Sequence, residues 1–579
     1  MPNLAKWKGK AGIDFPEKGT GLYLWIAVVT LVSVVINGYQ ANSTDLMLYL
    51  SYLPIYKGYN PYHPIDLLML AKVAGCHYYT FGIFPLLLLK QCISLPLACF
   101  GIHLVCQYFI FLMFYYLVLW LSGKKEIAWL ALGLLIFKKM VAGTPVGTLE
   151  DVFSVRSIAL PMLFLSLLYY AKGKPWRSFL LAGFAGNFHL LSSGLVMGVL
   201  FISSLLGEER RKWRQTILMS MGYMGCLAPL LYWRFSNYSQ TYLGVPLIAD
   251  SEWLRIVHAR APYLFISQWG PLSLLSLLAM AVIILLLLMN REKIKLSPVF
   301  TRMTLAVLII SLVSIILTQL EFSPAISFQS IRSIWYLNYF LMIGIAWMTY
   351  YYWKDGSEVN RMLVLILYIC WVFPLQRWGL ILSMIPAGLL ILNHKDNLLV
   401  SSYGRKAFLS SVVFGMTFLG VFVFGSEFKY GINMSEQINK FVAHMDIYGK
   451  NTEKYWIDVQ LWAKENTPPG SLFITPPDKV GFRYYSERSP LVENKDGAMS
   501  VYSQEYAREW DHRMKALGIL PRCDARYYGK IYDQLPSWRL IWVGSYYGAD
   551  YLVVRNSVHP GMKLLYQNPE YSLYRMSPE

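Results

Sequence analysis

The chain has 579 residues, of which 56% are hydrophobic and only 15% are charged, and its formal net charge is +18. Soluble proteins are nearer about a quarter charged, and the apolar residues here gather in blocks of about 16–24 residues, which is long enough to cross a bilayer. The positive charge lies in short segments between these blocks and no nucleic-acid-reading motif is present, so nucleic acid is excluded as a partner.

The chain begins with a basic segment and an apolar block. Lys6, Lys8, Lys10 and Lys18 precede the first block, which predicts a cytoplasmic N-terminus. No small-residue cleavage site follows this block, so we expect a retained helix and not a signal peptide. A long outer loop, about 39–96, separates it from the second helix.

The apolar blocks predict about 11–13 membrane helices. In chain order they are expected at about 21–38, 97–121, 127–141, 154–171, two short helices in 178–206, 215–234, 270–290, 302–320, 333–352, two short helices in 361–393, and 407–425. Each short pair is interrupted by a polar or proline-containing stretch, GNFHLLSSG in the first and PLQRW in the second. If each pair is counted as two helices, every basic turn falls on the cytoplasmic side and residues 426–579 fall outside.

The last 150 or so residues have a different character. Turn signals such as TPPG and TPPD alternate with short β-type runs such as SLFIT and YLVVR, and WIDVQLWAKEN has the pattern of an amphipathic helix. The predicted fold class is therefore mainly α: a polytopic transmembrane helical bundle over 1–425 and a C-terminal extracytoplasmic α/β domain over 426–579. The protein is expected to be multi-pass in the cell inner (plasma) membrane, with this domain periplasmic or extracellular.

Charged residues near the outer ends of the helices are the candidate site residues, because charge near hydrocarbon is costly and commonly faces a cavity. Carboxylates can act as a general base or hold a divalent cation such as Mg²⁺ or Mn²⁺, and Arg and Lys can bind phosphate. The candidates are Asp45, Asp66, Lys138, Lys139, Glu150, Asp151, Arg156, His189 and Arg332.

Each candidate also has a purely structural interpretation. Asp45 could cap a helix, Asp66 could stabilise a turn beside Pro64, and Glu150 or Asp151 could cap the helix that follows. Lys138 and Lys139 could extend to lipid headgroups, and His189 could be a buried hydrogen-bonded histidine.

The order of parts resembles the GT-C superfamily of membrane glycosyltransferases. The resemblance rests on TDLMLYL with Asp45, NPYHPIDLL with Asp66 and GTLEDVFSVRSIALP with Glu150, Asp151 and Arg156. The stretches FLLAGFAGNFHLLSSG and ENTPPGSLFITPPDKVGFRYYSERS are similar to an uncharacterised bacterial branch of this group. The paired acids of protein O-mannosyltransferases and the WWD-type motif of oligosaccharyltransferases are both missing, which disfavours those two activities.

The resemblance implies transfer of a sugar from a polyprenyl-phosphate-linked donor to a lipid or glycan acceptor outside the cytoplasmic membrane. In that enzyme Asp45 would be the general base. Asp66, Glu150, Asp151 or His189 would bind the acceptor or a metal ion, and Arg156, Arg332, Lys138 and Lys139 would bind donor phosphate. The alternatives are a transporter or flippase for a lipid-linked glycan, suggested by the two interrupted helix pairs, and a non-catalytic membrane assembly factor.

Overall fold

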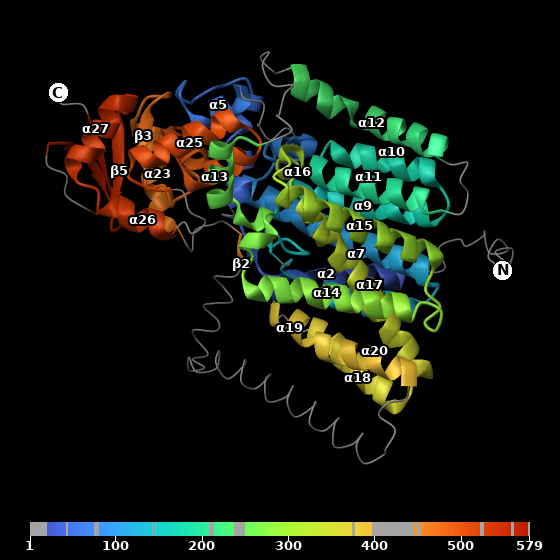
Figure 1. Cartoon of the computed structure of the whole chain (residues 1–579). Helices are drawn as coiled ribbons and strands as arrows, with labels where there is room; N and C mark the ends of the chain where they lie inside the picture. The colour runs from blue at the N-terminus through green and yellow to red at the C-terminus, as the bar shows by residue number, and fades with distance from the viewer. Residues whose placement is uncertain are drawn as a thin grey trace.

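The computed structural model describes residues 20–41, 44–73, 80–141, 143–144, 146–207, 213–236, 249–372, 377–396, 445–447, 453–520, 526–556 and 561–576. Over these ranges the protein is mainly helical, as the sequence predicts. Long helices form a bundle, and the C-terminal region lies at one end of that bundle (Figure 1). The helix expected at 407–425 lies outside the described residues.

The helices of the bundle lie in the expected apolar blocks, except that the described residues of the second interrupted pair form three helices and not two. The bundle helices are α2 (Thr20–Asn37), α7 (Leu95–Ser122), α8 (Lys125–Leu135), α9 (Val155–Ala171), α10 (Pro175–Gly186), α11 (Leu190–Leu205), α12 (Trp213–Ser236), α14 (Pro271–Met289), α15 (Pro298–Gln319), α17 (Ser333–Asp355), α18 (Glu358–Val372), α19 (Arg377–Leu382) and α20 (Met384–Asp396). Shorter helices lie in the long loops: α3 (Thr44–Leu50), α4 (Leu53–Tyr56), α5 (Leu67–Val73), α6 (Phe84–Leu89), α13 (Ser251–Arg260) and α16 (Ser323–Ser327).

Five of the described helices are long and apolar enough to cross a membrane, namely α2, α7, α12, α14 and α15. Their outer faces carry large apolar side chains, and Leu24, Met221, Leu285 and Ile316 are each more than half exposed. Soluble proteins rarely expose apolar stripes of this extent, so these faces suit hydrocarbon.

The third predicted helix is shorter than expected, because polar groups of α2 end it early. The Asn37 amide and the Ser33 hydroxyl both donate to the carbonyl of Ile136, each at 2.8 Å. The Lys138 backbone N–H then donates to Asn37 Oδ1 at 2.8 Å. These bonds take up backbone groups that would have extended α8, so the chain leaves the helix at Leu135.

The first interrupted pair is two helices, α10 and α11, and Asn187 fixes the break between them. Its amide donates to the carbonyl of Cys226 at 2.9 Å, and its carbonyl accepts from the N–H of Leu230 at 3.1 Å. Those two backbone groups lie four residues apart in α12, on either side of Pro229, where a proline weakens the helical ladder. One side chain therefore stabilises a turn in one helix and a proline site in another.

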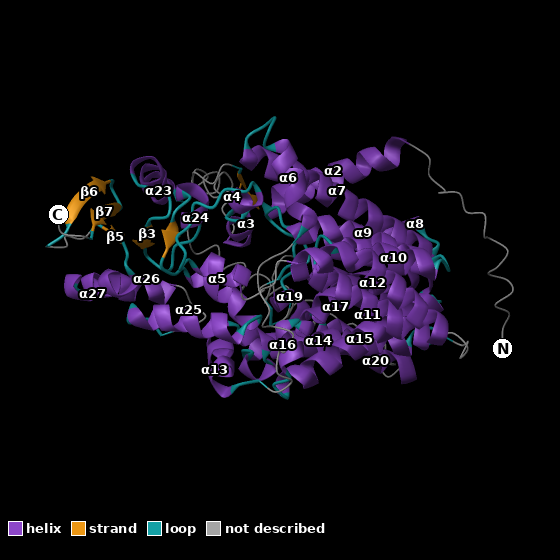
Figure 2. Ribbon diagram, turned by 90° about the horizontal axis from the view of Figure 1, so that it is seen from above, coloured by secondary structure: helices purple, strands orange, loops and turns teal. Residues whose placement is uncertain are grey.

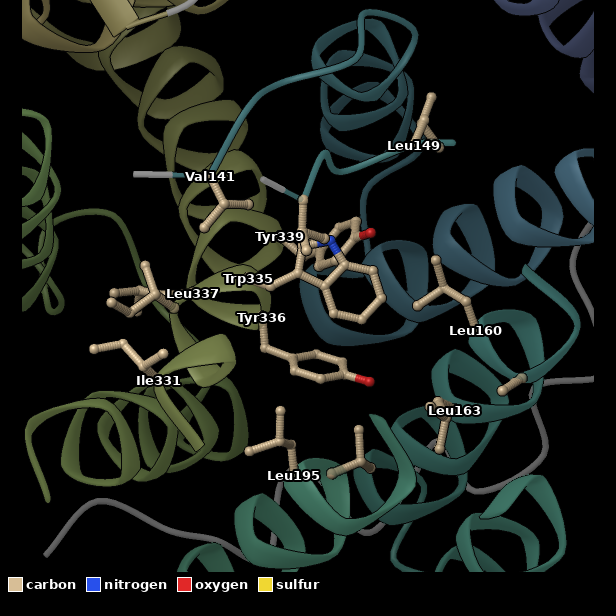
Figure 3. Packing of buried hydrophobic residues seen from close by; sticks show 14 of the residues in the cluster. Val141, Leu149, Leu160, Leu163, Leu195, Ile331, Trp335, Tyr336, Leu337 and Tyr339 are labelled. Atoms are coloured by element: carbon tan, nitrogen blue, oxygen red, sulfur yellow. The ribbon is translucent and has the colours of Figure 1, made fainter. Parts of the chain in front are cut away.

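Helix α17 is the centre of the bundle, and most of its side chains are buried. Trp335 and Tyr336 project from it between α9 and α11 (Figure 3). The Trp335 indole donates to the carbonyl of Gly147 at 2.8 Å, and the Tyr336 hydroxyl donates to the carbonyl of Ser192 at 3.1 Å. Tyr339 adds a hydrogen bond to the carbonyl of Thr148. Trp335 and Tyr339 therefore hold the loop between α8 and α9 in place, and Tyr336 joins α17 to α11.

The C-terminal region contains a five-stranded sheet in the order β4-β3-β5-β7-β6. Its strands are β3 (Leu472–Ile474), β4 (Ser489–Pro490), β5 (Tyr551–Arg555), β6 (Lys563–Gln567) and β7 (Tyr571–Arg575). β3 is parallel to β4 and β5, whereas β5, β7 and β6 are antiparallel. The helices around it are α23 (Lys454–Asn466), α24 (Phe482–Ser486), α25 (Gln504–Ala516), α26 (Arg526–Asp533) and α27 (Ser537–Tyr547). The TPPG turn joins α23 to β3, as the sequence predicts.

The C-terminal region packs on the loops at one end of the bundle, where α5 and α13 lie beside α25 (Figures 1 and 2). Strand β1 (Tyr39–Gln40), directly after α2, pairs in parallel with β2 (Met445–Asp446). The Trp253 indole of α13 donates to the carbonyl of Ser500 at 2.7 Å. The first outer loop and the C-terminal region thus form one continuous packed layer.

Candidate functional site

The loop between α8 and α9 carries two ion pairs at the end of the bundle. Lys138 Nζ lies 2.8 Å from Asp151 Oδ2, and Arg156 pairs with Glu150. The Arg156 guanidinium also lies over the Trp335 ring, 5.2 Å from its centroid. The side chains of Lys138 and Asp151 are 25% and 35% exposed, against 13% and 17% for Arg156 and Glu150. The pairs are therefore arranged from a solvent-accessible edge toward a more buried interior.

The shape of this loop depends on a glycine. Gly143 has a φ of +68°, and a Cβ there would lie 2.0 Å from the Trp269 ring. The loop then folds back, with the N–H of Val141 bonded to the carbonyl of Val146 at 3.0 Å. Only glycine suits this conformation and this close contact, so Gly143 sets the course of the loop between Lys138 and the acidic residues Glu150 and Asp151.

Lys139 points away from the ion pairs that its neighbour Lys138 joins. It is 9% exposed, its ammonium donates to the carbonyl of Val372 at 3.3 Å, and it lies over the Phe137 ring. The two adjacent lysines therefore occupy different environments. Only Lys138 belongs to the charged cluster, which consists of Lys138, Glu150, Asp151 and Arg156.

Helix α3, which bears Asp45, packs beside the same loop. Leu46 and Leu50 belong to one apolar cluster with Val152 and Phe153. The N–H of Gln40 donates to the carbonyl of Asp151 at 2.8 Å. The backbone of Asp45 lies in α3, while its side chain is outside the described residues. The two acid-bearing segments singled out in the sequence are thus neighbours in the fold.

Two residues in this area were missed by the sequence analysis. His103 and Gln107 are buried one turn apart on α7, and the Gln107 amide donates to the carbonyl of Glu150 at 3.2 Å. The His103 ring is 5.0 Å from the ring of Tyr39. The His103 ring lies beside the backbone of Val152, and Oε1 of Gln107 has no hydrogen-bond partner within the described ranges. The sequence pattern could have identified them, because both are polar residues in an otherwise apolar span and they lie four residues apart on one helix face.

A small apolar hollow lies in the apolar cluster that α3 shares with Val152 and Phe153. It lies between α3, the start of α7 and α24, and its lining includes Leu46, Cys99, Tyr484 and Tyr485. The C-terminal region therefore supplies part of the wall beside the segment that carries Asp45.

Asp66 lies apart from these groups, in the interface with the C-terminal region. It is fully buried, and its Oδ1 accepts from Arg483 Nε at 2.8 Å and from the N–H of Leu68 at 2.7 Å. Arg483 also binds Asp496 through two hydrogen bonds of 2.8 and 3.1 Å, and Glu493 Oε2 lies 3.6 Å away. Three buried carboxyl groups thus surround one guanidinium. Burial raises the pKa of Glu493, Arg483 opposes the shift, and Asp496 and Asp66 reinforce it.

His189 and Arg332 lie at helix ends. The His189 ring accepts from the N–H of Ser192 at 3.1 Å and so caps α11. Arg332 ends the turn η5 (Ser330–Arg332) directly before α17, three residues ahead of Trp335. Arg156 reaches the same helix through the Trp335 ring. Among the described residues, no group of three or more His, Cys, Asp or Glu side chains is arranged to hold a metal ion.

Comparison with known proteins adds one finding. A family model described as a domain of unknown function (DUF6798) matches residues 454–517. The matched segment runs from α23 to the end of α25 and contains Arg483, Glu493 and Asp496. No curated protein matches the chain. The matched segment therefore includes the side of the C-terminal region that contacts Asp66, and it excludes the β5–β7 strands.

Proposed function

We propose that this protein is a membrane glycosyltransferase of the GT-C type. It transfers a sugar from a polyprenyl-phosphate-linked donor to a hydroxyl of a lipid or glycan acceptor. The reaction takes place at the end of the bundle that carries the C-terminal region, on the outer side of the cytoplasmic membrane.

The observation that carries the proposal is the charged cluster at the end of the apolar bundle. Ion pairs that are partly exposed and partly buried, next to membrane-length helices, suit a substrate with a lipid tail and a phosphate. Arg156 and Lys138 supply positive charge, Glu150 and Asp151 supply carboxylates, and α3 brings Asp45 to the same loop. The polar groups of His103 and Gln107 extend this polar environment into the span.

In the proposed reaction the Asp45 carboxylate takes the proton of the acceptor hydroxyl. The hydroxyl oxygen bonds to the anomeric carbon of the donor sugar, and the bond from that carbon to the phosphate oxygen breaks. Polyprenyl phosphate leaves with the bonding electrons, and Arg156, Arg332 and Lys138 stabilise the negative charge it carries. Arginine suits this role because its guanidinium can bind two phosphate oxygens at once.

The experiment is a transfer assay with the full chain in membrane vesicles and a panel of synthetic polyprenyl-phosphate sugars. We expect the wild-type protein to release polyprenyl phosphate from one of them. Asp45→Asn should lower the rate by about 10²–10⁴-fold, as loss of a general base does. Glu321→Gln, an exposed acid at the end of α15, is the matched control and should retain the rate. Movement of intact donor across the membrane without release of phosphate would favour the flippase alternative instead.

A further inference from the structure

Three lysines from distant parts of the chain meet at the edge of the packed layer. Lys57 follows α4, Lys90 follows α6, and Lys464 lies in the last turn of α23. Lys464 Nζ is 2.7 Å from Glu487 Oε1, and the Lys90 ammonium is within electrostatic range of Lys57, Lys464 and Glu487. Three ammonium groups and one carboxylate leave an excess of two positive charges. An anion at this place would relieve their repulsion.

The helix beside these lysines exposes apolar side chains. In α6, Phe84, Leu88 and Leu89 are 45%, 66% and 38% exposed. A short helix on a water-facing surface rarely exposes three large apolar side chains together. The apolar side chains and the lysines together have the composition of an element that lies on a membrane surface.

The position of α6 agrees with this interpretation. Helix α7, a candidate membrane span, begins at Leu95, just after Lys90. Phe84 stacks on Trp233, which lies in the last turn of the candidate span α12, with ring centroids 5.9 Å apart. The neighbouring Tyr232 is 77% exposed. Aromatic residues at the ends of spans are typical of the boundary between lipid and water.

We infer that α6 and the three lysines form a membrane-surface contact, in which α6 enters the headgroup layer and Lys57, Lys90 and Lys464 bind anionic phospholipid headgroups. Because Lys464 belongs to the C-terminal region, this contact seats that region on the bilayer at the end of the bundle. The occupant follows from two features together. The excess positive charge selects an anion, and continuity with the spans α7 and α12 selects a lipid over an acidic protein segment.

The electrostatics of Lys90 are consistent with a site awaiting an anion. Burial lowers the pKa of Lys90, Lys57 and Lys464 lower it further, and Glu487 opposes them. Lys57 and Lys464 thus disfavour the charged form of Lys90, and a bound headgroup phosphate would favour it.

The test uses the full chain in a neutral detergent, titrated with a fluorescent short-chain phosphatidylglycerol and, in parallel, with phosphatidylcholine of the same chain length. We expect phosphatidylglycerol to bind more tightly. Each lysine at an anionic surface contributes about five-fold in affinity, so Lys57→Gln, Lys90→Gln and Lys464→Gln combined should weaken binding by about 10²-fold. The same three positions changed to arginine should retain it, because the charge is kept.

The matched control is the triple variant Lys454→Gln, Lys530→Gln and Lys563→Gln. These three exposed lysines lie elsewhere in the C-terminal region, and their loss changes the net charge equally. It should leave the affinity unchanged. Leu88→Ser with Leu89→Ser should weaken binding of phosphatidylglycerol and phosphatidylcholine alike, because the apolar contact is shared.

Three results would overturn the inference. One is an unchanged phosphatidylglycerol affinity in the triple glutamine variant while its melting temperature matches wild type. Another is an equal loss in the control variant. The third is displacement of the bound lipid by inorganic phosphate or polyglutamate at equal charge concentration, which would show a site for free phosphate or for an acidic polymer.

Discussion

Arg156 makes two contacts that a lysine would not reproduce. Its guanidinium pairs with Glu150 and lies over the Trp335 ring at 5.2 Å. A planar guanidinium can stack on an aromatic ring and bind two oxygens at the same time, whereas an ammonium is a point charge. The contacts of Arg156 therefore depend on the planar shape of the guanidinium as well as on its charge.

We expect Arg156→Lys and Arg332→Lys to fold and to bind a polyprenyl-phosphate donor more weakly, by about 10-fold each, which corresponds to the loss of one charge-assisted hydrogen bond. The measurement is donor affinity of the purified protein, with its melting temperature as the control for folding. Unchanged affinity in both variants would remove these arginines from phosphate binding.

At the residue scale, the sequence located charged positions but not their partners. Glu150 and Arg156 are six residues apart, so their pairing across one loop was within reach. Asp66 and Arg483 are separated by 417 residues, and no local pattern predicts such a pair. His103 and Gln107 lie inside a span and not at a helix end, and polar residues within a span indicate a site equally well.

Among the elements, the contact between the first outer loop and α24 depends on unequal charges. One guanidinium faces three carboxyl groups, so the two sides of the pair are not equivalent. Removing Arg483 would leave three buried acids without a cation, whereas removing the charge of Asp66 would leave Arg483 still bound to Asp496.

Arg483→Met is therefore expected to lower the stability of the full chain by about 3–5 kcal/mol, as the loss of one partner of a buried pair does. Asp66→Asn should cost much less, because the amide oxygen can still accept from Arg483 and from Leu68. The measurement is thermal unfolding in detergent. Arg508→Met, which breaks an exposed pair with Asp250 and Glu252, should cost no more than about 1 kcal/mol. Equal effects at Asp66 and Arg483 would contradict this account.

The same cluster predicts a pH dependence. Burial raises the pKa of Glu493 from 4.5 to about 8, so the folded protein keeps a proton that the unfolded chain loses near its ordinary pKa. The stabilisation by this proton is complete below the ordinary pKa and is lost as pH rises toward about 8. We expect the melting temperature to fall over that interval, and Glu493→Gln, which resembles the protonated form, to remove most of the decrease. A wild-type slope retained in Glu493→Gln would assign the pH dependence to another group.

The elements themselves were largely predictable where periodicity and composition agree. Apolar blocks placed α2, α7, α12, α14 and α15 to within a few residues, because hydrocarbon length fixes helix length. The end of α8 was not predictable, since it depends on Asn37 and Ser33 of another helix. The short helices of the first outer loop were also not predicted, because packing against α7 and the C-terminal region stabilises them.

For the whole molecule, the membrane orientation remains a prediction that one fusion can test. The basic turns and the count of crossings place the C-terminus outside. A phosphatase fused after Glu579 should be active, and a reporter that works only in the cytoplasm should be silent there. A fusion in the turn between α7 and α8, at Gly123, is the control and should give the opposite pattern. Inverted results at Glu579 alone would mean that one interrupted pair crosses the membrane once fewer.

The junction between the first outer loop and the C-terminal region also has a consequence for how the protein is made. Asp66 is synthesised 417 residues before Arg483. At a translation rate of about 5–20 residues per second, this is a delay of roughly 20–80 seconds. During that time Arg483 has not yet been made, so the loop must stay hydrated, because the Asp66 carboxylate is too costly to bury alone. If translation stops while the bundle helices are being made, this loop cannot complete its packing. Full assembly of the outer layer therefore requires that the C-terminal region has been synthesised.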